Sequence, residues 1–220
     1  MPMPALIFDL DGTLTDSKPG ILDCLGKVIA ARGLSYPGPL DHFIGPPVDE
    51  WTIELLPHGS TDDRAALAQE YRTCYDEEGW SNNSVYPGVH TMLADLARHG
   101  CALYVCTSKP QHFASRILDL FALTPFFTAI YGDKSEYASH SKVDLLARLL
   151  REQSLSPDST WMVGDRSFDF DAAHANGIRC LAAGWGYGTP QEYATADALA
   201  ATPAQVADLV LPASQAVAKG

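Results

Sequence analysis

Short runs of continuous apolar residues recur along the chain and predict its central strands. They lie at residues 5–8, 102–106, 127–131, 161–163 and 178–182. Successive positions are apolar and do not alternate with polar residues, which indicates strands that are covered on both faces, as in a parallel sheet. The pattern therefore predicts a sheet with a helical layer on each side.

Amphipathic segments lie between these runs and predict helices. Residues 88–99 carry apolar side chains at helical spacing, and Gly100 follows them as a typical C-terminal stop. Residues 142–151 repeat this pattern with Val and Leu side chains. Because strands and helices alternate from residue 86 onward, we expect an α/β core: a Rossmann-like, doubly wound parallel sheet.

The segment over residues 17–84 breaks this alternation and contains no candidate for a central strand. An apolar stripe follows Pro19 and ends at Gly33, and a second helix is predicted from Thr61 to about residue 78. Turns rich in proline and glycine separate the two helices. The predicted domains are a catalytic core of residues 1–16 and 85–220 and an inserted α-helical domain of residues 17–84.

Composition and charge narrow the range of partners. The chain has 220 residues, 46% of them hydrophobic, and a formal net charge of -12, which argues against a nucleic-acid groove. No apolar run approaches the roughly 20 residues of a membrane helix, so we expect no membrane partner. Five scattered cysteines without C-x-x-C spacing, and a first segment without a secretory pattern, favour a cytoplasmic protein. The sequence leaves the oligomeric state open.

Polar residues of a particular kind follow the predicted strands. In open α/β sheets, ligands bind at the carboxyl ends of the strands, so these side chains are expected on one rim. Carboxylate oxygens suit Mg²⁺, whereas lysine and helix N-terminal amides suit phosphate. The sequence therefore predicts a site for a metal and an anion. Its candidate residues are Asp9, Asp11, Thr107, Ser108, Lys109, Lys142, Asp165 and Asp169.

Four motifs in this chain resemble those of haloacid dehalogenase-superfamily phosphatases. They are D-L-D-G-T-L-T-D at 9–16, T-S-K-P at 107–110, Lys142, and G-D-R-S-F-D at 164–169. The helical insert stands where that family carries a C1-type cap domain. The resemblance implies a Mg²⁺-dependent hydrolase of a phosphomonoester, acting on a small phosphorylated metabolite.

Three further stretches are similar to the phosphoglycolate phosphatase-like branch of that family. They are Gly45-Pro46-Pro47, Tyr86-Pro87-Gly88 and Trp185-Gly186-Tyr187. Phosphoglycolate is therefore the first substrate to consider. The chain departs from that branch over residues 132–140, where Asp133 and Glu136 replace neutral groups. The substrate preference of the branch is therefore not transferred to this chain on the resemblance alone.

The resemblance implies separate roles for the two aspartates of the first motif. Asp9 would attack phosphorus and form an aspartyl-phosphate. Asp11 would protonate the leaving alkoxide and then deprotonate the water that hydrolyses this intermediate. Family members that dehalogenate lack the second aspartate, so Asp11 favours phosphoryl transfer.

The other motifs would hold the metal and the phosphoryl group. Thr107, Ser108 and Lys142 would contact phosphoryl oxygens. Mg²⁺ would be held by the carboxylates of Asp9 and Asp165 and by the backbone carbonyl of Asp11. Asp169 would act one shell further out, where it would orient Lys142 or metal-bound water.

Several of these residues have structural alternatives. Thr107 alone is compatible with a helix N-cap, and Lys109 is as well explained by the surface as by a substrate site. Arg166 is expected at the surface. In the insert, Gly45 and Pro46 are candidate substrate contacts, but turns of this kind also serve packing. The segment 184–188 is rich in glycine but lacks dinucleotide-binding spacing, so we interpret it as a loop.

Two other functions stay open at this point. A phosphomutase of the same superfamily would return the phosphoryl group to a second sugar hydroxyl. A catalytically silent homologue would bind or regulate without turnover, although the complete set of motif residues speaks against that.

Overall fold

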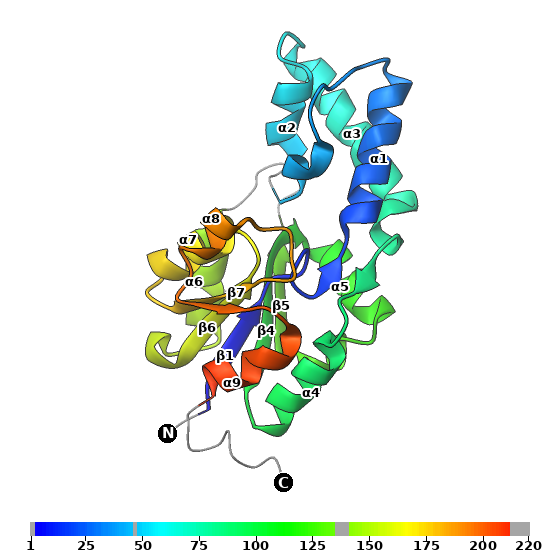
Figure 1. The fold of residues 1–220 in the computed structure, drawn as a ribbon. Helices are drawn as coiled ribbons and strands as arrows, with labels where there is room; N and C mark the ends of the chain where they lie inside the picture. The colour runs from blue at the N-terminus through cyan, green and yellow to red at the C-terminus, as the bar shows by residue number, and fades with distance from the viewer. Residues whose placement is uncertain (1–2, 46–47, 135–140, 212–220) are drawn as a thin grey trace. The chain divides into compact units, whose positions relative to one another are not determined.

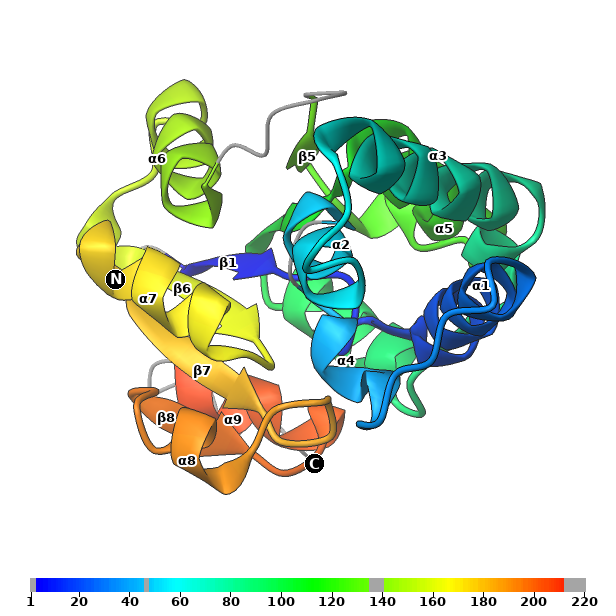
Figure 2. The same ribbon diagram turned by 90° about the horizontal axis from the view of Figure 1, so that it is seen from above.

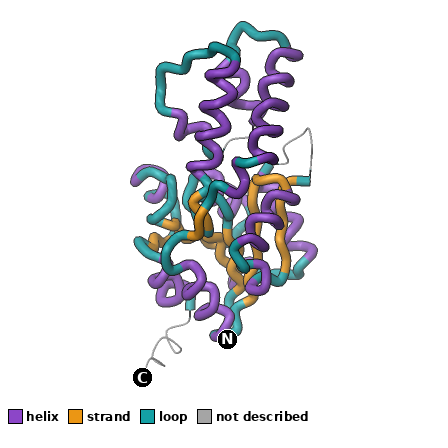
Figure 3. The backbone as a smooth tube through the Cα atoms, turned by 90° about the vertical axis from the view of Figure 1, so that its right-hand side faces the viewer, coloured by secondary structure: helices purple, strands orange, loops and turns teal. Residues whose placement is uncertain are grey.

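The computed structural model describes residues 3–45, 48–134 and 141–211. Its internal contacts divide the chain into two units, one of Met1–Thr15 with Val85–Gly220 and one of Asp16–Ser84. Pro46 and residues 135–140 of the atypical loop lie outside the described residues. In Figure 3 the strands of the main sheet lie in the first unit, and the second unit consists of helices and loops. The two short strands at the boundary are the exception.

The first unit contains a parallel sheet of six strands in the order β5-β4-β1-β6-β7-β8. Numbered along the core alone, this is the order 3-2-1-4-5-6 of doubly wound dinucleotide-binding folds, which confirms the predicted fold class. The chain order reverses between β1 and β6, where such folds bind their ligands. The strands are β1 (Ala5–Phe8), β4 (Ala102–Pro110), β5 (Ala129–Asp133), β6 (Thr160–Gly164), β7 (Arg179–Ala183) and β8 (Ala198–Ala200).

Helices cover both faces of this sheet (Figures 1 and 2). On one face, α6 and α7 pack against each other and against β4 to β7. Their apolar side chains, with Phe170 of α7 among them, share one buried cluster with Ile7 and Met162 of the sheet. The helices of the other face include α4, α5 and α9. The helices of this unit are α4 (Val89–Arg98), α5 (Gln111–Leu120), α6 (Lys142–Glu152), α7 (Ser167–Ala175), α8 (Pro190–Tyr193) and α9 (Val206–Val210), with 3-10 helices η3 (Thr124–Phe126), η4 (Pro157–Ser159) and η5 (Pro203–Gln205).

All five predicted apolar runs are strands, with bounds that differ from the prediction by at most a few residues. The run at 102–106 continues as strand to Pro110, and Pro110 is the N-cap of α5. Thr107 is therefore not a helix N-cap, and that alternative is wrong. Strand β8 was not predicted, because three residues at the edge of a sheet leave no recognisable apolar run.

The second unit is helical and has its own apolar contacts. Its elements are α1 (Lys18–Ala31), η1 (Leu40–Phe43), α2 (Val48–Leu55), α3 (Thr61–Glu77) and η2 (Gly79–Ser81). Aromatic rings of Phe43, Trp51, Tyr71 and Tyr75 lie in sequence, with neighbouring centroids 5.1 to 6.0 Å apart. Helix α3 begins at a capping box between Ser60 and Asp63. The prediction missed α2, because its eight residues stand among proline- and glycine-rich turns.

Two short strands mark the boundary between the units. Strands β2 (Thr15–Asp16) and β3 (Ser84–Val85) form a two-stranded sheet where the chain leaves the first unit and where it returns. Within the described residues, no helix is both long enough and apolar enough to cross a membrane.

Candidate active site

Strand β1 carries Asp9 to the rim of the sheet. The four residues of β1 are buried, and the Asp9 amide still donates to the carbonyl of Val163 in β6 at 2.9 Å. The chain then turns through Gly12, whose φ of +83° lies in the left-handed region that favours glycine. Asp9 thus stands at the point where the strand order reverses, and Asp11 stands in the turn that follows.

Lys142 is the cation nearest to Asp9 in the described part of the chain. It is the first residue of α6, which Ser141 caps by accepting the Asp144 amide. Its Nζ lies 2.8 Å from Oδ1 of Asp9 and 2.5 Å from Oδ1 of Asp169, and its side chain is 9% exposed. Lysine at the start of the helix after β5 therefore contacts two separate motifs.

Burial and these contacts decide the charge states. Burial raises the pKa of Asp9 to about 6, although the Lys142 ammonium pulls it down. Burial alone would lower the pKa of Lys142, but the carboxylates of Asp169 and Asp9 outweigh it and the pKa is raised. Lys142 is therefore a permanent ammonium at neutral pH.

Asp9, Asp165 and Asp169 form a buried acidic trio. One carboxylate oxygen of each lies within 4.8 Å of the others. Burial raises the pKa of Asp165 well above its ordinary value, and the negative charges of Asp169 and Asp9 raise it further. Lys142 is the single cation that contacts the trio among the described ion pairs, so its charge does not balance three carboxylates. The donor set and the excess negative charge fit a hard divalent cation such as Mg²⁺.

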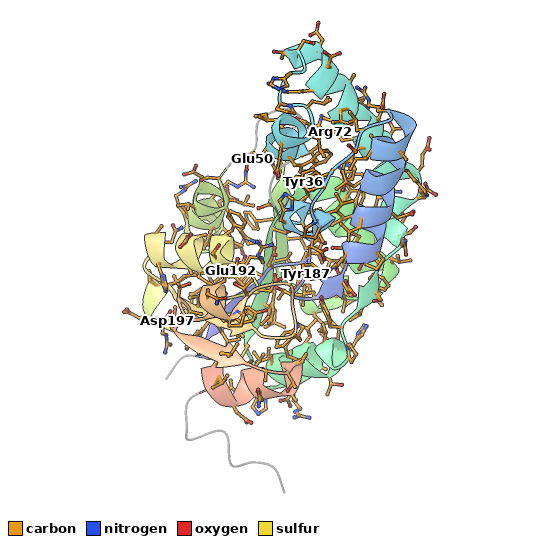
Figure 4. The ribbon with its side chains drawn as sticks, turned by 45° about the horizontal axis from the view of Figure 1, so that its top comes forward. Tyr36, Glu50, Arg72, Tyr187, Glu192 and Asp197 are labelled. Atoms are coloured by element: carbon orange, nitrogen blue, oxygen red, sulfur yellow. The ribbon has the colours of Figure 1, made fainter. Side chains whose placement is uncertain are left out.

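Backbone and hydroxyl groups fix the Asp165 carboxylate in place. The Tyr187 amide donates to Oδ2 at 2.7 Å, and the Thr13 hydroxyl donates to Oδ1 at 3.3 Å. The Trp185 indole donates to the carbonyl of Thr13 at 2.9 Å, which ties the first motif to the glycine-rich loop. Figure 4 labels Tyr187 at this position.

The glycines of this loop permit its close approach. A Cβ at Gly186 would lie 2.2 Å from the carbonyl oxygen of Gly12 and 2.3 Å from Cβ of Asp165. From the sequence, residues 184–188 were predicted to be a loop that contains a family-like stretch, and the structure shows that they pack directly on a candidate metal ligand. Two glycines flanking Tyr187 after an apolar strand were the available signal.

Lys109 pairs with Asp11 inside the core unit. Its Nζ lies 2.7 Å from Oδ2 of Asp11, and its side chain is 6% exposed. Thr107 is buried and its hydroxyl accepts the Lys109 amide at 3.2 Å, while Ser108 is exposed. Of the two alternatives for Lys109, the surface one is therefore wrong. Its ammonium lies against the candidate acid and base.

Arg166 is also less exposed than predicted. Its Nε donates to Glu192 at 2.8 Å, and its side chain is 22% exposed. Glu192 also accepts the amides of Ser167 at 3.3 Å and Thr189 at 2.9 Å. Burial alone would raise the pKa of Glu192, but these hydrogen bonds, above all that from Arg166, lower it to about 2. Glu192, labelled in Figure 4, thus holds the segment between Asp165 and α7.

The two predicted substrate contacts, Gly45 and Pro46, do not belong to the core unit. Gly45 is exposed and belongs to the unit Asp16–Ser84, and Pro46 lies outside the described residues. Of the atypical loop, Gly132 and Asp133 end β5. The geometry of the core unit brings together Asp9, Asp11, Thr107, Lys109, Lys142, Asp165 and Asp169.

A family profile of haloacid dehalogenase-like hydrolases matches residues 6–183. The chain belongs to this family. The predicted family membership is therefore confirmed, and the profile spans every motif residue discussed above.

Three relatives of this haloacid dehalogenase-like chain carry the names of different enzymes. The tyrosine-protein kinase PtkA of Mycobacterium tuberculosis is 42% identical over 185 residues, which cover 83% of this chain and 62% of the kinase. The 5'-nucleotidase of Pseudomonas aeruginosa is 36% identical over 192 residues and 86% of each chain. The phosphoglycolate phosphatase of Rhodospirillum rubrum is 33% identical over 197 residues, covering 83% of this chain and 80% of that one, which bears out the predicted likeness.

The fold has a solved counterpart among these relatives. The structure of PtkA superimposes with a TM-score of 0.79 at 35% identity, covering 96% of this chain and 99% of the solved one. The present chain nevertheless spans less than two thirds of the full kinase sequence.

Proposed function

We propose that this haloacid dehalogenase-like protein is a Mg²⁺-dependent phosphatase that hydrolyses a small phosphomonoester through an aspartyl-phosphate at Asp9. The observation that carries this proposal is the buried cluster in which Lys142 lies 2.8 Å from Asp9 and 2.5 Å from Asp169. A strand-borne carboxylate, a neighbouring ammonium and two further carboxylates provide a nucleophile together with sites for phosphate and metal.

The residues of the core unit divide the reaction between them. Asp9 attacks phosphorus. Because a carboxylate is a weak nucleophile, the rate depends mainly on how the end of β1 positions this carboxylate. Asp11, held by Lys109, gives a proton to the leaving alkoxide and later takes one from water. The phosphoryl oxygens bind to Thr107 and Ser108 and to the ammonium of Lys142.

The metal site follows from the same residues. The carboxylates of Asp9 and Asp165 and the backbone carbonyl of Asp11 would hold Mg²⁺, with Asp169 orienting Lys142 or metal-bound water. When bound, Mg²⁺ supplies positive charge that offsets the carboxylates and the phosphoryl group. The glycine-rich loop orients Asp165 through the Tyr187 amide.

Substrate choice is assigned to the insert. Its position in the sequence matches a C1-type cap, so residues 17–84, with Gly45 and Pro46 foremost, would contact the part of the substrate away from the phosphoryl group. Relatives that carry the names phosphoglycolate phosphatase and 5'-nucleotidase support small phosphorylated metabolites as substrates, with phosphoglycolate first. A cytoplasmic location and the absence of nucleic-acid or membrane partners stay predictions from the sequence.

A second candidate function is phosphoryl transfer to a protein tyrosine. It is favoured by the identity of 42% with the tyrosine-protein kinase PtkA. The donor and the acceptor both differ: Asp9 would take the phosphoryl group from a nucleoside triphosphate and release the diphosphate, and a tyrosine hydroxyl would then attack the aspartyl-phosphate to give phosphotyrosine where water gives inorganic phosphate. In a sugar phosphomutase, a sugar hydroxyl would be the group that attacks the aspartyl-phosphate.

One set of assays separates these candidates. Parent protein and Asp9→Asn are incubated with a phosphomonoester panel, with labelled ATP and with hexose phosphates, each with Mg²⁺ and with EDTA. A phosphatase releases phosphate in the first assay, loses that activity in Asp9→Asn, and is silenced by EDTA until Mg²⁺ is restored. Phosphotyrosine or isomerised sugar phosphate without free phosphate would favour a transferase, and no turnover at all would favour a silent homologue. Indifference to EDTA would remove the metal from the proposal.

A further inference from the structure

A second group of ligating side chains lies in the core unit outside the candidate active site. Nε2 of His174 lies 3.2 Å from Oδ2 of Asp197. Sγ of Cys180 lies 3.3 Å from the same nitrogen and 3.4 Å from the same oxygen. A sulfur, an imidazole nitrogen and a carboxylate oxygen therefore form a nearly equilateral triangle.

This triangle belongs to the end of the sheet opposite to Asp9. His174 stands in the last turn of α7, Cys180 is the second residue of β7, and Asp197 directly precedes β8. The three thus gather at the amino ends of β7 and β8, whereas Asp165 follows the carboxyl end of β6. Along α7, His174 is five residues beyond Asp169, about 7.5 Å at the helical rise. Figure 4 labels Asp197 well apart from Tyr187, which binds Asp165.

A nucleophilic triad does not explain the arrangement. In a Cys-His-Asp relay, the two ring nitrogens of histidine face different partners, so that one receives the thiol proton and the other is oriented by the carboxylate. Here a single nitrogen, Nε2 of His174, faces both Cys180 and Asp197. The Cys180 side chain is fully buried, so its sulfur is not accessible to an external electrophile as a catalytic nucleophile must be.

The same geometry matches a tetrahedral metal site. Zinc binds sulfur at about 2.3 Å and nitrogen or oxygen at about 2.0–2.2 Å, which sets tetrahedral ligand atoms about 3.3–3.6 Å apart. The three separations of 3.2 to 3.4 Å lie within about 0.3 Å of this spacing, so small side-chain movements would bring the ligand atoms to it. The Cys180 amide also donates to Oδ2 of Asp197 at 2.8 Å, which orients the carboxylate before any ion arrives.

We propose that Cys180, His174 and Asp197 form a binding site for a borderline-soft divalent cation of the Zn²⁺ type, with water as the fourth ligand. The thiolate selects against Mg²⁺, which prefers oxygen ligands. Binding forms a sulfur–metal bond and releases the thiol proton to solvent. Side chains of His174 and Asp197 are 44% and 42% exposed, so the cation has an entry path on their side.

Such a site would fasten the edge of the sheet. Strand β8 has three residues and pairs only with β7 among the described strands. A cation held by His174, Cys180 and Asp197 would link α7, β7 and the segment that leads into β8. The expected consequence is a higher Tm with Zn²⁺ and no requirement for Zn²⁺ in catalysis.

Cobalt absorption tests this site directly in the whole 220-residue chain. The protein is stripped with a chelator, returned to excess Mg²⁺ to fill the all-oxygen site, and titrated with Co²⁺. We expect one equivalent of Co²⁺ to produce thiolate-to-cobalt charge-transfer absorption in the near ultraviolet, and Zn²⁺ to displace it. Cys180→Ser should lose the band, whereas Cys101→Ser, which removes a buried cysteine elsewhere, should keep it.

Two exposed ligands keep the test informative if Cys180→Ser fails to fold. His174→Ala and Asp197→Asn retain the thiol and should weaken Co²⁺ binding at least about tenfold. Cys24, Cys74 and Glu78 in the other unit also place ligand atoms within 4.8 Å of one another, so Cys24→Ser serves as a second control. The proposal is overturned if the parent protein gives no charge-transfer band, or if the band survives Cys180→Ser or is lost in Cys24→Ser.

Discussion

The ammonium nitrogen of Lys142 lies between two carboxylates, 2.8 Å from Oδ1 of Asp9 and 2.5 Å from Oδ1 of Asp169. The first carboxylate follows β1 and the second lies in the first turn of α7. One lysine therefore contacts both the first motif, at residues 9–16, and the last, at residues 164–169. Removing it would leave two buried carboxylates without their nearest counter-charge.

Replacement of Lys142 by Met should therefore lower kcat by about 10²–10³, as expected for loss of a group that stabilises transition-state charge. Its ammonium lowers the pKa of Asp9, so its removal raises that pKa above about 6. Asp9 must be ionised to attack, and the acid limb of the kcat profile should move to higher pH. The exposed Lys134→Met is the control and should leave the profile unchanged. An unshifted acid limb in Lys142→Met would argue against this role.

Lys109 offers a second test, because its ammonium contacts Asp11 rather than Asp9. Lys109→Met should reduce kcat about tenfold or more with a smaller change in KM, since the lysine acts on the group that moves protons. Ser108→Ala, at the exposed neighbouring position, separates this effect from loss of a phosphate contact. A raised KM with unchanged kcat in Lys109→Met would instead make Lys109 a substrate-binding residue.

Gly186 is predicted to control the affinity for Mg²⁺. A methyl group there would lie 2.3 Å from Cβ of Asp165 and 2.2 Å from the Gly12 carbonyl, so Gly186→Ala must displace one of them. We expect the Mg²⁺ concentration for half-maximal activity to rise at least about tenfold. Gly26→Ala is the matched control, because a Cβ at Gly26 meets nothing within 4 Å. Equal Mg²⁺ dependence in both variants would refute the positioning role of this loop.

Glu192 links stability to pH. Its pKa falls from 4.5 to about 2 on folding, so its contribution is present above about 4.5 and is lost as the pH falls towards 2. Glu192→Gln should lower the free energy of unfolding at pH 7 by about 1–2 kcal/mol, because Arg166 loses its charged acceptor. Urea unfolding between pH 2.5 and 7 should show this difference shrinking below pH 4.5. The exposed Glu77→Gln should track the parent at every pH, and a constant deficit in Glu192→Gln would contradict the linkage.

The motif residues were recognisable because their signals are local. An apolar run that ends in two aspartates separated by one residue needs only residues 5–11, and the helix that begins at Lys142 is read from its own apolar spacing. Parallel strands bring their carboxyl ends to one rim, so the grouping of Asp9, Thr107 and Asp165 followed from topology alone.

Other contacts depend on parts of the chain that no local pattern connects. Lys109 was left between surface and site because its partner Asp11 is brought to it by the pairing of β4 with β1. The loop at 184–188 looked like a turn, yet its indole reaches a carbonyl 172 positions earlier. Strand β8 and helix α2 are too short for their periodicity to stand out from neighbouring turns.

The sequence by itself determined the strand-helix alternation, the family and the residues of the four motifs, because hydrophobic periodicity and short spacings are properties of neighbouring residues. Only the tertiary structure decided which groups contact the buried carboxylates: the Lys142 ammonium for Asp9, the Lys109 ammonium for Asp11, and the backbone amide of Tyr187 for Asp165. It likewise brought Cys180, His174 and Asp197 together. Charge compensation and ligand geometry act through distances of about 3 Å, and those distances are set by how the sheet and its helices pack.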